Sequence, residues 1–161
     1  MTTGVRFPAE LEVPEAWETW WFRLEPLGPE HNERDYEAWT SSIDHIRKTP
    51  GFAPGDWGDD AWPYDMPLAS NLVDLERHAA EFRDKISFAY SVIAANSSDV
   101  LGCVYINADE TGAADAKVRC WLRSTSASDD VMFAAAIKGW LNKEWPFEKV
   151  RFPGRPRLNI G

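Results

Sequence analysis

The hydrophobic and polar positions of this chain predict helices and strands in a mixed order. Apolar and polar residues alternate over residues 17–27, which predicts a first strand with Phe22 and Leu24 on one face, together with Trp20. Gly28-Pro29 ends this strand. Over residues 31–47 the apolar side chains recur at spacings of three and four, which predicts one amphipathic helix carrying Tyr36, Trp39, Ile43 and Ile46.

A second helix is predicted over residues 71–85. Its apolar residues again recur at helical spacing, and Ser70 is a suitable N-cap. The same helix carries His78 beside its apolar face, where a histidine without a partner His or Cys at ligand spacing is more often structural than catalytic.

The second half of the chain predicts three strands, a helix and a strand. Short β-prone runs cover 88–94, 100–106 and 117–123, a helix follows over 129–143, and a last strand covers 147–152. The order β-α-α-β-β-β-α-β predicts an α+β fold, an α/β/α sandwich around a mostly antiparallel sheet. At 161 residues we expect one domain over 17–161, preceded by an extended arm over 1–16 that is rich in Pro and Glu.

Charge and composition narrow the function classes. The formal net charge of −9 argues against nonspecific binding to nucleic acid or to anionic membranes and favours a cationic partner such as an amine. The first residues contain no apolar run, so we expect no signal peptide or membrane anchor, and a cytoplasmic location by default. Cys103 and Cys120 both fall in predicted strands, where they are expected to be small buried residues.

The segment 49–69 is a candidate functional loop. It is longer than an ordinary connection, and its aromatic residues Trp57, Trp62 and Tyr64 are candidates to line a substrate pocket. The alternative is that these aromatics only fasten the loop to the core. The Asp residues of this loop lack the spacing of a calcium loop, so no metal site is predicted.

The turn between the strand 117–123 and the following helix is the best candidate binding site. It reads Arg123-Ser-Thr-Ser-Ala-Ser128, so small side chains and hydroxyls stand at a helix start where free N–H groups and the helix dipole favour an anion. Arg123 could add a charge-assisted contact to a phosphate. Ser128 is also an ordinary N-cap, and Asp129 and Asp130 would repel an anion there.

On these residues the chain resembles the GNAT superfamily of N-acetyltransferases. The element order matches that family over residues 20–152, and the family's turn motif falls on Arg123, Ser126 and Ser128, with serine at both glycine positions. The run 100–106, with its Gly102, resembles the family's third strand. The match ends before the further helix that often brings a thiolate-protonating Tyr in the family.

The resemblance implies acetyl-CoA as acyl donor and a small-molecule or peptide amine as acceptor. It implies that the strand end pairs with the pantetheine arm and that amides of the turn hold the pyrophosphate, which gives the cofactor-binding candidates Trp121, Leu122, Arg123, Ser124, Thr125, Ser126, Ala127, Ser128 and Asp129. The acetyl group would lie between the diverging last two strands. No catalytic residue is assigned. Asp115 is near enough in sequence to be a candidate base, and the two cysteines are remote candidates for an acyl-carrying nucleophile.

Two other interpretations stay open. A GNAT-like module could bind a ligand or form a homodimer through Trp-rich surface without catalysis. An unrelated α+β domain could also share the element order by chance.

Overall fold

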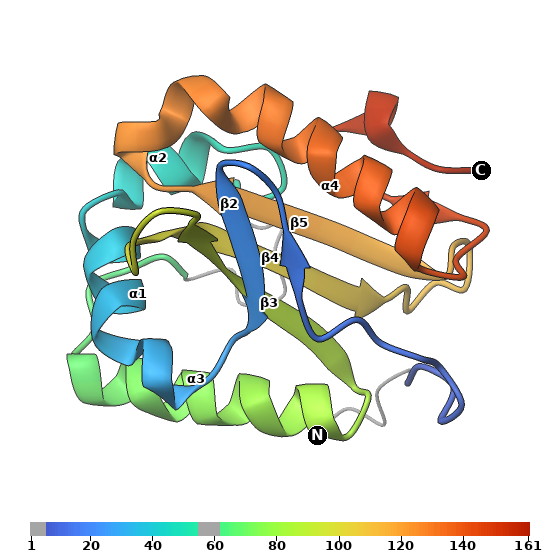
Figure 1. The fold of residues 1–161 in the computed structure, drawn as a ribbon, viewed down its shortest axis with the longest axis horizontal. Coiled ribbons are helices and arrows are strands. Elements are labelled where there is room, and N and C mark those ends of the chain that lie inside the picture. The colour runs from blue at the N-terminus through green and yellow to red at the C-terminus, as the bar shows by residue number, and fades with distance from the viewer. Residues whose placement is uncertain (1–5, 55–61) are drawn as a thin grey trace.

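The computed structural model describes residues 6–54 and 62–161. A curled sheet with strand order β1-β2-β3-β4-β5-β6 forms its centre, and every neighbouring pair is antiparallel except β5 and β6. Helices α1 and α3 lie on one side of the sheet, and α4 crosses the other (Figure 1). The predicted α+β sandwich is confirmed.

The first predicted strand is a small hairpin rather than one strand. β1 covers Trp17–Glu18 and β2 covers Phe22–Pro26. Between them the Thr19 hydroxyl accepts the N–H groups of Trp21 and Phe22, at 3.3 and 3.1 Å, and thereby closes a turn. Trp20 therefore stands at the turn, 84% exposed, instead of on the apolar face of a strand.

The first predicted helix is divided in two. α1 covers Asn32–Thr40 and α2 covers Ile43–Lys48, with the break at Ser41-Ser42. The Ser42 hydroxyl is buried and accepts the N–H of Ser124 at 2.9 Å, a tertiary contact at the point where the helix is interrupted. Trp39 and Ile46 are buried as their spacing predicts.

The second predicted helix, α3, covers Leu68–Arg83 and begins before the expected cap. Pro67 has extended backbone and precedes the first turn, where its carbonyl accepts the N–H of Ser70 at 3.0 Å. Ser70 therefore lies inside the helix and is not its N-cap. Pro67 takes the cap position because proline has no N–H to satisfy and its fixed φ suits a helix start.

The three central strands agree with the sequence pattern. β3 covers Ser87–Ala94, β4 covers Val100–Ala108 and β5 covers Ala116–Leu122. A Cβ added at Gly102 of β4 would lie 1.9 Å from the carbonyl oxygen of Trp121. Glycine at this position therefore lets the last residues of β5 approach the β4 backbone closely.

The remaining elements are shorter or later than expected. A 3₁₀ helix over Ser124–Asp129 precedes α4, which covers Asp130–Glu144, and β6 covers only Val150–Arg151. Short 3₁₀ turns also cover Pro29–His31 and Pro156–Leu158. No helix in the described ranges is both long and apolar enough to span a bilayer.

The described part of the predicted arm, residues 6–16, packs against the body of the domain. The N–H of Phe7 donates to the carbonyl of Lys85 at 3.2 Å, and the ring of Phe7 lies 4.9 Å from that of Phe88. Tyr90 donates its hydroxyl to the carbonyl of Pro14. Phe7 and Leu11 belong to the core on the α4 side of the sheet.

Candidate functional site

β5 and β6 diverge after a short parallel contact. Their pairing is confined to Ala116 with Val150 and Lys117 with Arg151, so the later half of β5 has no strand partner on that side within the described ranges. On the other side, the N–H of Arg123 donates to Leu101 at 2.7 Å. Because backbone groups alternate along a strand, Cys120 and Leu122 direct their N–H and C=O groups toward the open side.

The predicted turn carries few amides that are free for an anion. The N–H of Ser124 donates to the Ser42 hydroxyl at 2.9 Å, and that of Ser126 donates to the carbonyl of Arg123 at 2.9 Å. The N–H of Thr125 has no acceptor among the parts of the chain that the structure describes. Ser126 has a φ of −112°, so serine in place of the family's glycine causes no backbone strain here.

The other predicted cofactor residues divide by exposure. The side chains of Trp121 and Leu122 are fully buried and support the strand. The backbone of Leu122 faces the open side and is available to a ligand, whereas that of Trp121 pairs with Cys103 of β4, so the predicted backbone contact of Trp121 is not available. The exposed residues of the turn, which a ligand could reach, are Ser124, Thr125, Ala127 and Ser128, with Ser126 and Asp129 partly exposed.

Arg123 is engaged with α1. Its guanidinium donates to both carboxylate oxygens of Glu37, to the carbonyl of Val100 at 3.2 Å and to the hydroxyl of Ser41 at 3.4 Å. The Arg123 guanidinium lowers the pKa of Glu37. Arg123 thus joins α1 to the ends of β4 and β5, and its predicted contact with a phosphate stays a prediction.

Arg155 compensates one of the two carboxylates at the start of α4. Its two terminal nitrogens lie 2.8 and 2.9 Å from the oxygens of Asp130, and the two side chains are only 9% and 17% exposed. This bidentate pair reduces the repulsion that Asp130 alone would exert on an anion at the helix start.

The open strand edge and the turn fit acetyl-CoA in part. An extended pantetheine arm would have the unpaired backbone groups of Cys120 and Leu122 open to it, and a phosphate would have the amide of Thr125 beside a compensated Asp130. The amides of Ser124 and Ser126 are already satisfied within the protein. The backbone therefore leaves a free strand edge for the arm and few free amides for the diphosphate.

A cavity of about 540 Å³ lies on the opposite face of the sheet, between α3, the central strands and the loop that follows α2. Trp62 forms one wall, with its ring centroid 5.6 Å from that of Trp39 and 6.1 Å from that of Trp121. Tyr64 is 41% exposed and does not line the cavity. Trp57 lies outside the described residues.

The inner end of the cavity holds a buried polar network that the sequence did not reveal. The Asn71 amide donates to the Oδ2 atom of Asp35 at 3.0 Å, and the Cys103 thiol donates to Oδ1 at 3.5 Å. The indole N–H of Trp39 donates to Asn71 at 3.0 Å. Burial raises the pKa of Asp35 to about 6, because an ionised carboxylate is poorly solvated there.

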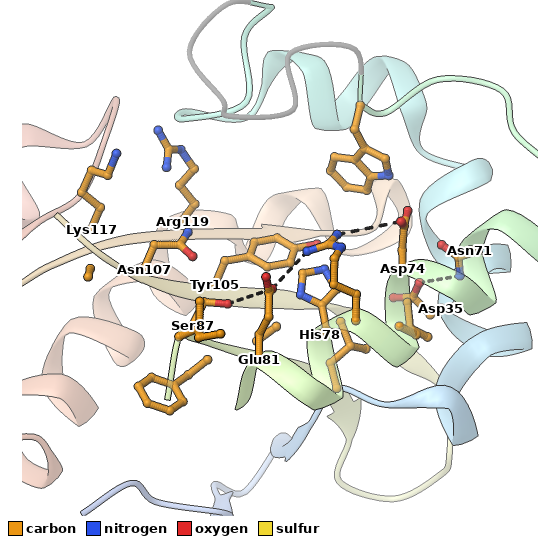
Figure 2. Close-up of a pocket in the computed structure, with 18 of the residues that line it drawn as sticks. Asp35, Asn71, Asp74, His78, Glu81, Ser87, Tyr105, Asn107, Lys117 and Arg119 are labelled. Atoms are coloured by element: carbon orange, nitrogen blue, oxygen red, sulfur yellow. Dashed lines mark hydrogen bonds and ion pairs between the residues drawn. The ribbon is translucent and has the colours of Figure 1, made fainter. Parts of the chain in front are cut away.

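His78 also differs from its expected role as a satisfied structural side chain. It lines the cavity, and its Nδ1 atom is buried with no hydrogen-bond partner among the described residues (Figure 2). Its ring lies against that of Tyr105 in a tilted arrangement, with centroids 5.9 Å apart and an interplanar angle of 34°. Burial lowers the pKa of His78 to about 3, so the ring is neutral at physiological pH and offers hydrogen bonds rather than charge.

The candidate catalytic residues Cys103, Cys120 and Asp115 have structural roles. Both cysteines are fully buried, and burial raises the pKa of Cys103 well above its usual value and that of Cys120 to about 12. Neither thiol is therefore activated as a nucleophile. Asp115 accepts the N–H groups of Glu148 and Lys149 at 2.8 and 3.0 Å and so holds the turn that leads into β6.

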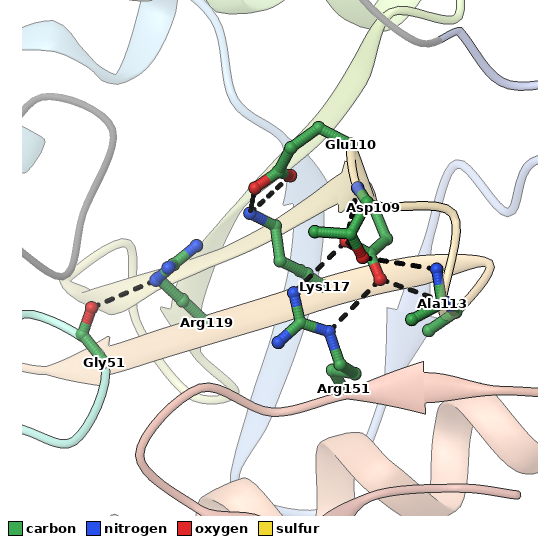
Figure 3. Close-up of polar contacts among 9 residues, drawn as sticks. Gly51, Asp109, Glu110, Ala113, Lys117, Arg119 and Arg151 are labelled. Atoms are coloured by element: carbon green, nitrogen blue, oxygen red, sulfur yellow. Dashed lines mark hydrogen bonds and ion pairs between the residues drawn. The ribbon is translucent and has the colours of Figure 1, made fainter.

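A second acidic residue fixes the point where β5 and β6 meet. The carboxylate of Asp109 accepts hydrogen bonds from the Nε and a terminal nitrogen of Arg151, both at 3.1 Å (Figure 3). It also accepts the N–H groups of Thr111 and Ala114. The neighbouring pair of Lys117 and Glu110 lies at the same end of the strands. These contacts set where the two strands diverge.

Comparison with known proteins gives structural matches alone. No protein-family profile matches the chain, and no curated protein sequence is similar to it. The solved ribosomal-protein-S5-alanine acetyltransferase from Vibrio fischeri superposes with a TM-score of 0.61 at 12% identity, over 84% of this chain and 71% of that one. The microcin C7 self-immunity acetyltransferase MccE, solved with acetyl-CoA and AMP, gives 0.58 at 11% identity, over 82% and 68%.

A further match is the Salmonella typhimurium acetyltransferase that modifies the N-terminal serine of the 50S ribosomal protein L7/L12. It superposes with a TM-score of 0.58 at 8% identity, over 83% of this chain and 71% of that one. At such low identities the likeness establishes the fold and leaves the substrate open.

Proposed function

We propose that this chain, which has the fold of the GNAT acetyltransferases, is an N-acetyltransferase that takes its acetyl group from acetyl-CoA. The observation that carries the proposal is the divergence of β5 from β6, which leaves a free strand edge leading to the start of α4. The structural neighbours are acetyltransferases, and MccE was solved with acetyl-CoA bound. The acceptor is a small-molecule or peptide amine.

The backbone of this chain would do most of the binding. Cys120 and Leu122 would pair with the amides of the pantetheine arm, and the turn from Ser124 to Asp129 would face the diphosphate, with the Thr125 amide as its free donor. When bound, acetyl-CoA supplies an activated acetyl group. The chain would hold that group between the two strands and keep it out of bulk water, which lowers the entropic part of the barrier.

Acetyl-CoA is expected to raise the melting temperature of the protein. At about 100 times its Kd, a ligand stabilises the folded state by about 2.7 kcal/mol, which corresponds to a shift of about 5–10 °C for a domain of this size. Differential scanning fluorimetry with acetyl-CoA and with free CoA measures this shift. An unchanged melting temperature at millimolar ligand would rule out the proposed donor.

A charge placed at Thr125 separates cofactor binding from stability. Thr125→Glu puts a carboxylate beside the free amide, so we expect the affinity for CoA to fall at least about tenfold, or about 1.4 kcal/mol. Thr125→Gln has nearly the same size without the charge and is expected to bind CoA like the wild type. The melting temperature of each variant should lie within a few degrees of the wild-type value. The added carboxylate of Thr125→Glu is tolerated because acidic residues favour helix starts. Equal CoA affinity in the two variants would place the diphosphate elsewhere.

A second candidate function is a ligand-binding or dimerising module without catalysis. Its support is that the guanidinium of Arg123 and the amides of Ser124 and Ser126 already donate hydrogen bonds within the protein. Fewer donors are therefore free to bind a diphosphate. Of the tryptophans in the described ranges only Trp20 is exposed, at 84%, so the predicted Trp-rich surface is reduced to one side chain that a second copy could cover. Release of free thiol from acetyl-CoA with a panel of amines distinguishes the two, since a module of this kind releases none.

A further inference from the structure

Asp35 is a buried carboxylate at the inner end of the cavity and has no cationic partner among residues 6–54 and 62–161. It is 4% exposed, and its direct contacts are the neutral groups of Asn71 and Cys103. His31 lies near enough to act on Asp35 electrostatically, but its ring is hydrogen-bonded to other groups. Nδ1 accepts the N–H of Gly28, and Nε2 hydrogen-bonds the carboxylate of Glu25. A buried charge without a counter-ion is costly, so this carboxylate favours a cation from outside.

The other charged side chains that line the cavity have contacts of their own. Lys117 pairs with Glu110 at 2.6 Å, and Arg77 pairs with Glu81 at 3.1 Å and with Asp74 at 3.8 Å. The Nε of Arg119 donates to the carbonyl of Gly51 at 3.0 Å (Figure 3). Among the residues that the structure describes, four acidic and three basic side chains line the cavity, an excess of negative charge that favours a cationic ligand.

The walls beside Asp35 are apolar and aromatic. Trp39 and Trp62 lie together with centroids 5.6 Å apart, and Leu75 and Ala89 also line this part of the cavity. Aromatic faces attract organic cations, and the Nδ1 atom of His78 adds one unused hydrogen-bonding position. A volume of about 540 Å³ is in the range of sites for small molecules rather than for folded partners.

We propose that this cavity binds a small primary amine with an aromatic or apolar body, whose ammonium group pairs with Asp35. The proposal rests on the proposed function, because this amine would be the acetyl acceptor. Asp35 is well placed for that role, since Cys103, which it contacts, pairs with Trp121 of β5 across the β4–β5 ladder. The ammonium would therefore bind one strand away from the open edge of β5.

The test measures amine binding by isothermal titration calorimetry in the absence of acetyl-CoA. The probes are 2-phenylethylamine, tryptamine and hexylamine, each compared with the alcohol of the same body. We expect at least one amine to bind the wild type ten times more tightly than its alcohol. Asp35→Asn should abolish this preference, while Glu110→Gln, which removes a rim carboxylate of the same cavity, should keep it.

A measurement on the wild type protects the test against a variant that misfolds. Lowering the pH from 7.5 to 5 protonates Asp35, so the affinity for the amine should fall while that for the alcohol stays constant. The titratable groups that face Asp35 are Cys103 from β4, Asp74 from α3 and His31 from the turn before α1. Amines that bind no better than alcohols, or an Asp35→Asn protein with the wild-type preference, overturn the proposal.

The outcome is separable from that of the proposed function. If amine binding depends on Asp35 but no acetyl group is transferred, the ammonium site is supported and the proposed acetyltransferase activity is overturned. Acetylation of amines with the same kcat/KM in the wild type and in Asp35→Asn supports the enzyme and overturns the ammonium site.

Discussion

Replacing Asp109 with alanine is expected to lower the free energy of unfolding by about 3 kcal/mol at neutral pH. The Asp109 side chain has no exposed surface, and its carboxylate accepts five hydrogen bonds from Arg151, Thr111 and Ala114. Alanine leaves two loop N–H groups without an acceptor and frees β6 from the end of β4. Urea unfolding followed by Trp fluorescence measures the change.

The pH dependence of this effect has a definite sign. The Arg151 guanidinium, followed by the Thr111 donors, holds the pKa of Asp109 well below its ordinary value of 3.8. The ionised carboxylate therefore stabilises the folded state above pH 3.8, and the contribution is lost as the pH falls further. The difference between wild type and Asp109→Ala should shrink in acid, and Asp109→Asn, which keeps the shape without the charge, should lie between them.

This contact also bears on the candidate site. Arg151 pairs with Lys117 where β5 and β6 meet, so Asp109 fixes the point from which the two strands diverge. If the open edge of β5 binds acetyl-CoA, the Asp109→Ala protein should bind it less tightly even at temperatures where it remains folded. Unchanged acetyl-CoA affinity would show that the divergence does not depend on this anchor.

The sequence predicted the larger elements of the fold because their patterns are local. The helical spacing of Leu75 and Phe82 and the apolar runs of β3, β4 and β5 are sufficient to place α3 and the central strands. The predictions are wrong where a tertiary contact determines the bounds of an element. The break between α1 and α2 lies where Ser42 turns to the amide of Ser124, which is far away in the sequence.

The cofactor-binding role of the turn after β5 stays a prediction, and the contacts of its residues could not be read from the sequence for the same reason. The strand-to-helix turn could be located from its small residues, but the engagement of Arg123 by Glu37 depends on how α1 packs. Asp35 falls at helical spacing from the buried Trp39, and an acidic residue on an apolar face was a signal that could have marked it. Its contact with Cys103 joins residues on separate elements, so no pattern in the sequence reveals it.

Asp35 should make the protein less stable as the pH rises from about 4 to 6.5, opposite to the effect of Asp109. Its pKa is about 6 in the folded state against 3.8 ordinarily, so over this range the unfolded chain loses a proton that the folded protein keeps. The difference amounts to about 3 kcal/mol once both states are ionised. Below pH 3.8, where both states are protonated, the penalty vanishes.

The difference between Asp35→Asn and the wild type isolates this term, because the other titrating groups are common to both. The free energy of unfolding of the variant, relative to the wild type, should rise by about 2.4 kcal/mol between pH 4 and pH 7. Urea titrations at several pH values measure the rise, and a difference independent of pH would mean that Asp35 is not forced to ionise in an apolar site. Saturating amine should remove most of the rise, because a bound ammonium supplies the counter-charge that the fold itself does not bring to Asp35. The same carboxylate that weakens the protein at neutral pH would thus be the group that selects its ligand.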